Sequence, residues 1–181
     1  MPRSANLLVL APYTKRLGIA VYDHRELIYF AVKTFKSPRT PDSVDLETCS
    51  LVKNLVAKFG TDLILLKTLS RSQAGPGNHQ AMALSVKKTA EAISLPVKEV
   101  SFQAARAKIV REGKSTNRNT FVELGLKYPE VSRFANFQNY SQAEYYTPLL
   151  VAITIGLIHV RRARKERHST TKLTKKRHTS T

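Results

Sequence analysis

The sequence predicts an α/β domain with a mixed five-stranded sheet and helices on both of its faces. Two observations predict this class. Three strand-like segments, residues 6–10, 17–22 and 27–34, follow one another with short turns between them, which is typical of an antiparallel meander. The chain then alternates helix, strand, helix, strand and helix up to about residue 160, an order that adds parallel strands to the meander.

The first half of the chain carries clear turn and helix signals. Residues 12–16 form a tight turn between the first two strands. After the third strand, the polar loop 37–43 leads into a helix that ends at about Phe59. Asp42 or Ser43 can cap this helix, because short polar side chains accept hydrogen bonds from its free N–H groups.

The second half of the chain supplies the parallel strands. Residues 62–66 are almost continuously apolar, which predicts a strand buried on both faces and parallel to the first strand. Residues 97–100 form the fifth predicted strand. The helices predicted in this half cover residues 80–93, 103–111, 116–127 and 141–158.

The chain is expected to form one domain, residues 1–160, followed by a basic C-terminal tail, residues 161–181. The tail contains nine Lys and Arg residues against one Glu. Its composition cannot bury a core, so we expect disorder in the free protein, although the last helix can continue into it. A flexible basic arm adds salt-sensitive phosphate contacts without sequence choice. The alternative is a tail that serves solubility or localisation.

The net charge favours a polyanionic partner. The sequence has 30 Lys and Arg residues against 13 Asp and Glu, a net charge of +17. Nucleic acid is the commonest partner of such proteins, while an anionic membrane, an acidic protein or a surface-charged protein without a defined site are the alternatives. The longest apolar run, residues 149–160, is too short to span a bilayer, which favours a buried helix and no membrane partner.

Cysteine usage restricts the chemistry further. Cys49 is the single cysteine, so an internal disulfide or a cysteine-based zinc site is excluded. This fits a reducing compartment, and we expect the cytoplasm or another reducing compartment that holds nucleic acid.

The first hairpin carries a family resemblance. The strand Leu7–Leu10 ends at Ala11 and is followed by Pro12-Tyr13-Thr14-Lys15-Arg16 and a Gly-Ile-Ala-Val strand. This segment resembles the opening of RuvC-type and YqgF-type nucleases, in which the strand ends in Asp-Pro-Gly-Thr-Lys-Arg. The resemblance implies an RNase H-like fold and a function on DNA in recombination and repair.

The resemblance continues along the chain in the family's order. Leu-Pro-Val-Lys-Glu-Val-Ser, residues 95–101, resembles the RuvC stretch Leu-Pro-Val-x-Glu-x-Ser. Residues 112–118 resemble the family's Gly-x-Ala-x-Lys turn, residues 126–131 the end of its next helix, and residues 143–152 its Asp-Ala-x-Asp motif. Together these segments extend the resemblance over about residues 6–160.

Members of the family hold two Mg²⁺ ions with four carboxylates, because two hard cations need several anionic oxygens. The resemblance places these positions at Ala11, Lys67, Glu144 and Thr147, so one carboxylate of the four remains. A lysine at a metal position repels Mg²⁺. Lys67 is expected either to contact phosphate directly or to pair with Glu144.

Basic residues outside these positions are the candidate phosphate contacts. They lie in the first turn, after the fourth strand, around residues 106–118 and at the start of the tail. The candidates are Lys15, Arg16, Lys67, Arg71, Arg106, Lys108, Arg111, Lys114, Arg118, Arg161, Arg162, Arg164 and Lys165.

Our leading hypothesis is a RuvC-like pseudo-nuclease that binds branched or duplex DNA in an accessory or structural role, without enzymatic activity or cofactor. The resemblance also allows a homodimer, as resolvases form. One alternative is an active Mg²⁺-dependent junction endonuclease with displaced acids, with Glu144 as a metal ligand. The other is a basic RNA-associated scaffold protein.

Overall fold

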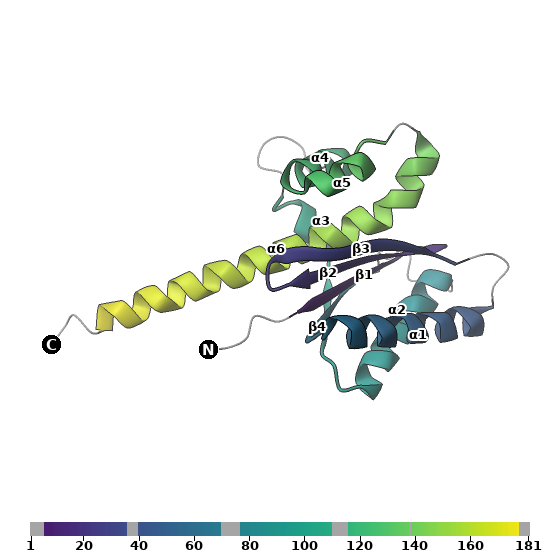
Figure 1. Ribbon diagram of the computed structural model, residues 1–181, viewed down its shortest axis with the longest axis horizontal. Coiled ribbons are helices and arrows are strands. Elements are labelled where there is room, and N and C mark those ends of the chain that lie inside the picture. The colour runs from purple at the N-terminus through teal and green to yellow at the C-terminus, as the bar shows by residue number, and fades with distance from the viewer. Residues whose placement is uncertain (1–5, 36–39, 70–76, 110–115, 138, 178–181) are drawn as a thin grey trace.

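The structure is a computed structural model that describes residues 6–35, 40–69, 77–109, 116–137 and 139–177, with the backbone alone for residues 41 and 162–177. The described part forms three layers (Figure 1). A twisted sheet lies in the middle, helices α1 (Pro41–Phe59) and α2 (Asn78–Ala92) cover one face, and the later helices cover the other.

The described residues form one five-stranded sheet in the order β3-β2-β1-β4-β5. The strands are β1 (Leu7–Pro12), β2 (Arg16–Asp23), β3 (Glu26–Thr34), β4 (Leu63–Lys67) and β5 (Val97–Val100). β1 pairs antiparallel with β2 and parallel with β4, and β5 is parallel to β4. The predicted α/β class, the meander and the two parallel strands are confirmed.

Alternation along the central strands separates two cores. Leu8 and Leu10 of β1 pack with α1 and α2, while Leu7, Val9 and Ala11 face the later helices. One correction concerns the start of α1, where the capping residue is Thr40 instead of Asp42 or Ser43. The reason is Pro41, whose fixed φ suits the first helical position and places the cap one residue earlier.

The second face of the sheet is covered by α3 (Phe102–Arg106), α4 (Asn117–Lys127), α5 (Pro129–Ala135) and α6 (Tyr140–Arg177). α3 is shorter than the predicted helix 103–111. α5 was not predicted as a separate element. The backbone of Tyr128 is extended, as expected for a residue before proline, so α4 ends there and Pro129 begins a new helix.

α6 is the core helix of this face. Residues 149–158 are all buried, and the backbone at Pro148 lies against Gly18 of β2 so closely that a Cβ there would be 1.9 Å from the Pro148 carbonyl oxygen. The Tyr22 hydroxyl donates to the carbonyl of Ile153 over 2.7 Å. By length and mean hydropathy (1.3) the segment Tyr140–Arg161 could cross a membrane, but 67% of its most apolar window is buried in the fold, as in the core helix of a globular protein.

The backbone of α6 continues beyond the core to Arg177 and projects from the body of the molecule (Figure 1). This agrees with the expectation that the last helix extends into the basic segment. The side chains after Arg161 lie outside the described residues. The division into a domain, residues 1–160, and a basic tail that is disordered when free stays a prediction.

Candidate nucleic-acid interface

Two candidate residues end neighbouring parallel strands at one edge of the sheet. The β1–β4 register pairs Leu10 with Leu66, so Ala11 and Lys67 occupy the next positions along the two strands. Both face the α6 side, because side chains two residues apart in a strand share a face. Ala11 is fully buried, and Lys67 is only 6% exposed. We call this region, with Tyr13, Arg16 and the first turns of α6, the strand-end edge.

The Lys67 ammonium lies against an aromatic ring. Its Nζ is 4.2 Å from the centroid of the Tyr13 ring, and a cation on a desolvated ring face gains about 2 kcal/mol. Burial lowers the pKa of Lys67 from 10.5 to about 8, and burial raises the pKa of Tyr13 from 10.0 to about 12. At neutral pH the site therefore holds a largely protonated lysine beside a neutral phenol.

The first turns of α6 carry the other two candidate positions. Thr147 Oγ1 donates to the carbonyl of Ala143 over 2.6 Å, within the helix. Pro148 has no N–H, so the carbonyl of Glu144, four residues earlier, loses its helical donor. Arg16 Nη1 takes that place at 3.4 Å from the carbonyl oxygen, and it also bonds Glu144 Oε1 at 3.1 Å.

Arg16 is therefore bound within the protein. Its side chain is 19% exposed, and that of Glu144 is 54% exposed. Its guanidinium lies over the Tyr145 ring at 5.0 Å. Within the described part of the chain, the ion pair of Glu144 is with Arg16 and not with Lys67, which corrects the expected Lys67–Glu144 pair. The physical reason is Pro148, which offers Arg16 a second acceptor on the same residue.

Three acids elsewhere in the fold have other partners. Asp62 accepts from the backbone N–H of Asn6 over 2.8 Å, Glu47 pairs with Lys33, and Asp45 accepts from the Ser85 hydroxyl. Among the described residues, no group of three or more His, Cys, Asp and Glu side chains could hold a metal.

The residues of the strand-end edge do not fit a pair of Mg²⁺ ions. The four family positions supply a buried methyl group, a buried cation, a hydroxyl bonded within its own helix and one carboxylate paired with arginine. Mg²⁺ prefers several anionic or carbonyl oxygens in octahedral geometry. The Lys67 ammonium at this edge also repels a divalent cation.

A second basic region lies on α3, on residues 107–109 that follow it and on α4, and we call it the outer basic surface. Arg106 Nη1 donates to Asn117 Oδ1 over 2.8 Å, which joins the two helices. Lys108 and Arg118 are exposed. Arg71, Arg111 and Lys114 lie outside the described residues.

The remaining candidates are in the first turn and on α6. Lys15 is exposed between β1 and β2, and Arg161 is half-buried on α6. Burial and, second, the nearby charge of Arg161 on α6 lower the pKa of Lys127 at the end of α4. The side chains of Arg162, Arg164 and Lys165 lie outside the described residues.

A path of aromatic rings, which could not be predicted from the sequence, leads away from this edge. Tyr145 contacts Tyr146 edge-on at 4.9 Å, and Tyr146 contacts Phe134 of α5 at 4.9 Å. The sequence shows that residues 128–146 are rich in aromatic rings, but α5 was needed to bring Phe134 to Tyr146.

Comparison with known proteins was made at the levels of sequence and of structure. No protein-family model and no curated protein matches the sequence. Solved structures do match. The Thermus thermophilus RuvC structure is 13% identical with a TM-score of 0.67, and the match covers 89% of this chain and 96% of that one. The chain has the fold of RuvC-type Holliday junction resolvases.

Two further resolvase structures agree with this fold. Thermus thermophilus RuvC in complex with a Holliday junction substrate is 16% identical with a TM-score of 0.61, over 88% of this chain and 96% of that one. The yeast mitochondrial Holliday junction resolvase Ydc2 is 12% identical with a TM-score of 0.62, over 94% of this chain and 85% of that one. At these identities the likeness to RuvC and Ydc2 shows the fold, and the RNase H-like architecture predicted from the sequence is confirmed.

Proposed function

We propose that this chain is a RuvC-like protein that binds DNA, branched or duplex, in an accessory or structural role and does not cleave it. The observation that carries the proposal is the position of Lys67. A buried ammonium stands at the end of β4 beside Ala11, where the RuvC-like opening of the chain implies metal ligands. A cation in this place attracts a backbone phosphate and opposes a divalent metal.

The charge of the whole chain supports the same proposal. The net charge of +17 raises the local concentration of polyanions, and a structure of similar fold has been solved with a Holliday junction. Phosphate contacts determine most of the affinity and carry no sequence information. The proposed protein therefore recognises the shape and charge of nucleic acid, with Lys67 as a contact inside the fold.

Binding and cleavage can be measured together. Purified protein is incubated with a four-way DNA junction, a linear DNA duplex and a duplex RNA, in Mg²⁺, Mn²⁺ or EDTA, at stated salt. We expect binding to DNA in all three conditions and no product. Metal-dependent cleavage would overturn the proposal, and its loss in Glu144→Ala would identify an active nuclease with displaced acids. Tighter binding to RNA than to both DNA forms would favour the RNA-associated scaffold.

A substitution tests the role of Lys67 itself. Lys67→Met keeps the length of the side chain and removes the charge. We expect about tenfold weaker DNA binding, since one charge-assisted phosphate contact is lost. The matched control is Lys88→Met, an exposed lysine of α2 on the opposite face of the sheet, which we expect to leave affinity almost unchanged. Equal losses of DNA affinity in the two variants would show that Lys67 contributes no more than a surface charge, and would contradict its proposed role as a phosphate contact.

A further inference from the structure

A depression lies between α5 and the start of α6, outside the strand-end edge. Its volume is about 450 Å³, within the range of about 300–1,000 Å³ that small-ligand pockets occupy. We call it the α5–α6 pocket. It is lined by Arg133, Phe134, Asn136, Phe137, Gln142 and Tyr146.

Rings form the walls of the α5–α6 pocket, and they are held in place. Phe134 packs against Tyr146 at 4.9 Å and edge-on against Phe30 of β3 at 6.0 Å. Phe137 packs edge-on against the buried Phe121 at 5.9 Å. Because each wall ring is supported by a ring behind it, the pocket is formed without a bound ligand.

Polar groups stand around these rings. The guanidinium of Arg133 lies over the Phe134 ring at 4.5 Å, and Arg133 and Asn136 are exposed. The backbone N–H of Gln142 donates to Asn139 Oδ1 over 2.9 Å, which fixes the backbone that carries the Gln142 carboxamide. The lining thus combines aromatic faces, two carboxamides and one cation.

This combination matches the chemistry of an unpaired nucleobase. Unstacked bases bind proteins by stacking on aromatic rings or guanidinium planes, while carboxamides pair with base edges. A paired base in a duplex exposes no face to such a pocket. Building on the proposed nucleic-acid binding, we infer that the α5–α6 pocket takes an unpaired base of the bound strand, which stacks on the pocket rings beside Arg133.

The position of the pocket supports the inference. Tyr146 contacts Tyr145, and Tyr145 lies under Arg16, so the aromatic path joins the pocket to the strand-end edge. A strand bound at the strand-end edge would therefore lie near the pocket. Junctions and bulges offer such bases, whereas a linear duplex does not.

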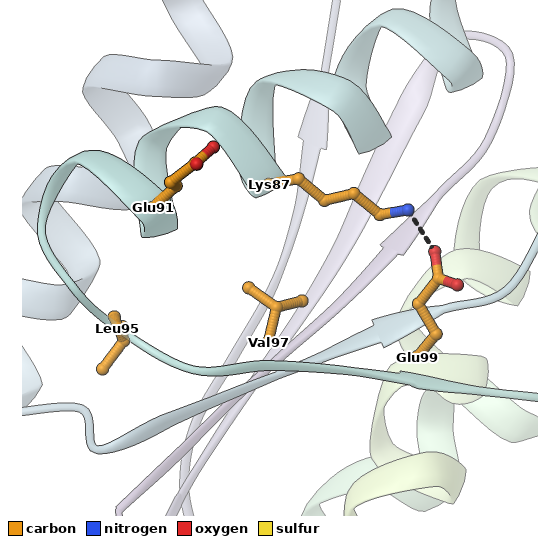
Figure 2. A pocket seen from close by; sticks show the side chains of 5 residues that line it. All are labelled: Lys87, Glu91, Leu95, Val97 and Glu99. Atoms are coloured by element: carbon orange, nitrogen blue, oxygen red, sulfur yellow. Dashed lines mark ion pairs between the residues drawn. The ribbon is translucent and has the colours of Figure 1, made fainter.

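A second depression on the protein has a lining that does not suit a nucleobase. It lies between α2 and the edge strand β5, on the other face of the sheet, with a volume of about 490 Å³ (Figure 2). Lys87 reaches across it to Glu99 over 2.5 Å, and Glu91 adds a second carboxylate above a floor of Leu95 and Val97. It has no aromatic lining and an excess of negative charge, so it repels a nucleotide.

The test uses the full chain and two DNA duplexes that differ by one unpaired 2-aminopurine, whose fluorescence falls when the base is stacked. We expect the bulged duplex to bind about tenfold tighter than the paired one, since one stacked base has that effect. Its fluorescence should be quenched on binding. Tyr146→Leu and Arg133→Ala should each abolish the preference and the quenching, with affinity for the paired duplex within about twofold of wild type.

Matched controls separate this site from general charge and aromaticity. Tyr140→Leu removes a ring that is 83% exposed and outside the lining, and Arg118→Ala removes a cation of the outer basic surface. Both should keep the preference for the bulge. If Tyr146→Leu does not fold, Arg133→Ala and Gln142→Ala carry the test, because both side chains lie outside the buried core.

The outcomes distinguish the inference from the proposed function. Equal affinity of wild type for bulged and paired duplexes, or a preference that survives in Tyr146→Leu and Arg133→Ala, would overturn the pocket and leave DNA binding intact. Absence of binding to both duplexes and to the four-way junction would overturn the proposed function. A shift of Tyr146→Leu from dimer to monomer, with no bulge preference in wild type, would assign the pocket to a second copy of the chain.

Discussion

The strand-end edge and the outer basic surface contain the same kinds of cation in different settings. At the strand-end edge, Lys67 is buried against Tyr13, and Arg16 is bonded to Glu144. On the outer basic surface, Lys108 and Arg118 project into solvent. A buried cation has already lost its hydration, which lowers the stability of the fold. It therefore interacts strongly with an anionic group that comes into contact with it. An exposed cation costs little and contributes mainly a salt-dependent attraction. We therefore expect the strand-end edge to contribute one strong contact through Lys67, and the outer basic surface to contribute salt-dependent affinity.

The largest expected effect concerns the contact that closes the strand-end edge. In Gly18→Val, the new Cβ would lie 1.9 Å from the carbonyl oxygen of Pro148 and 2.1 Å from its carbonyl carbon, both backbone atoms. Because neither α6 nor β2 can give way, we expect a loss of more than about 3 kcal/mol in the free energy of unfolding. Urea denaturation followed by circular dichroism measures it.

Gly60→Ala is the control for Gly18→Val. Gly60 has a φ of +57°, but a Cβ there would meet no atom closer than 3.9 Å. We expect a loss of about 1 kcal/mol from backbone strain alone. If both substitutions cost the same, close packing of α6 on β2 does not determine the geometry of the edge.

The second prediction uses the buried lysine. The pKa of Lys67 is lowered from 10.5 to about 8 in the folded protein. Between pH 8 and about 10.5, this lysine is therefore protonated in the unfolded chain and deprotonated in the folded one. The free energy of unfolding therefore rises with pH across this window, by up to about 3 kcal/mol. Lys67→Met should be more stable than wild type at pH 7.5, and its free energy of unfolding should not show this rise with pH.

Tyr13 limits the pH range in which the contribution of Lys67 to stability can be measured. Its pKa is raised to about 12, so the folded protein retains a proton that the unfolded chain loses, and stability falls as pH rises from 10 to 12. Urea unfolding at pH 7.5 and 9.5 isolates the lysine contribution. We assign this pH dependence of stability to Lys67. The assignment would be contradicted if Lys67→Met kept the same pH dependence as wild type, or if Lys88→Met lost it.

The third prediction concerns the Arg16–Glu144 contact. Arg16→Ala removes a bond to the carboxylate, a bond to the carbonyl that Pro148 leaves free, and the contact with Tyr145. We expect a loss of about 2 kcal/mol, against about 0.5 kcal/mol for Glu144→Gln, because an exposed ion pair alone contributes little. A double-mutant cycle measures the coupling. Equal losses would show that the carboxylate, and not the helix carbonyl, fixes Arg16.

The fold could be predicted because strands, turns and helix ends are marked by local sequence. The ion-pair and hydrogen-bond partners within the strand-end edge could not be predicted in this way. Three strand segments in a row, the turn at residues 12–16 and the apolar run ending at Leu66 appear directly in the sequence. Sequence places Lys67 and Glu144 at one edge, but it does not say which cation reaches the carboxylate. Pro148 was the available signal, since a proline inside a helix frees the carbonyl four residues earlier. The sequence does not distinguish α5 from α4, because the same proline ends α4 at the residue before it and begins α5.

The smallest expected effect separates the two regions by salt. The slope of log affinity against log salt falls by about 0.9 for each phosphate contact removed from duplex DNA. Lys108→Gln and Arg118→Gln should each lower the slope by about that amount, while Arg16→Gln should leave it unchanged because Arg16 is already neutralised by Glu144. Fluorescence anisotropy from 50 to 200 mM salt measures the slopes. Lys88→Gln, on the opposite face of the sheet, should also have no effect. A similar fall in all four variants would mean that DNA is attracted by the net charge of the whole molecule, and the distinction between an inner contact and an outer surface would be lost.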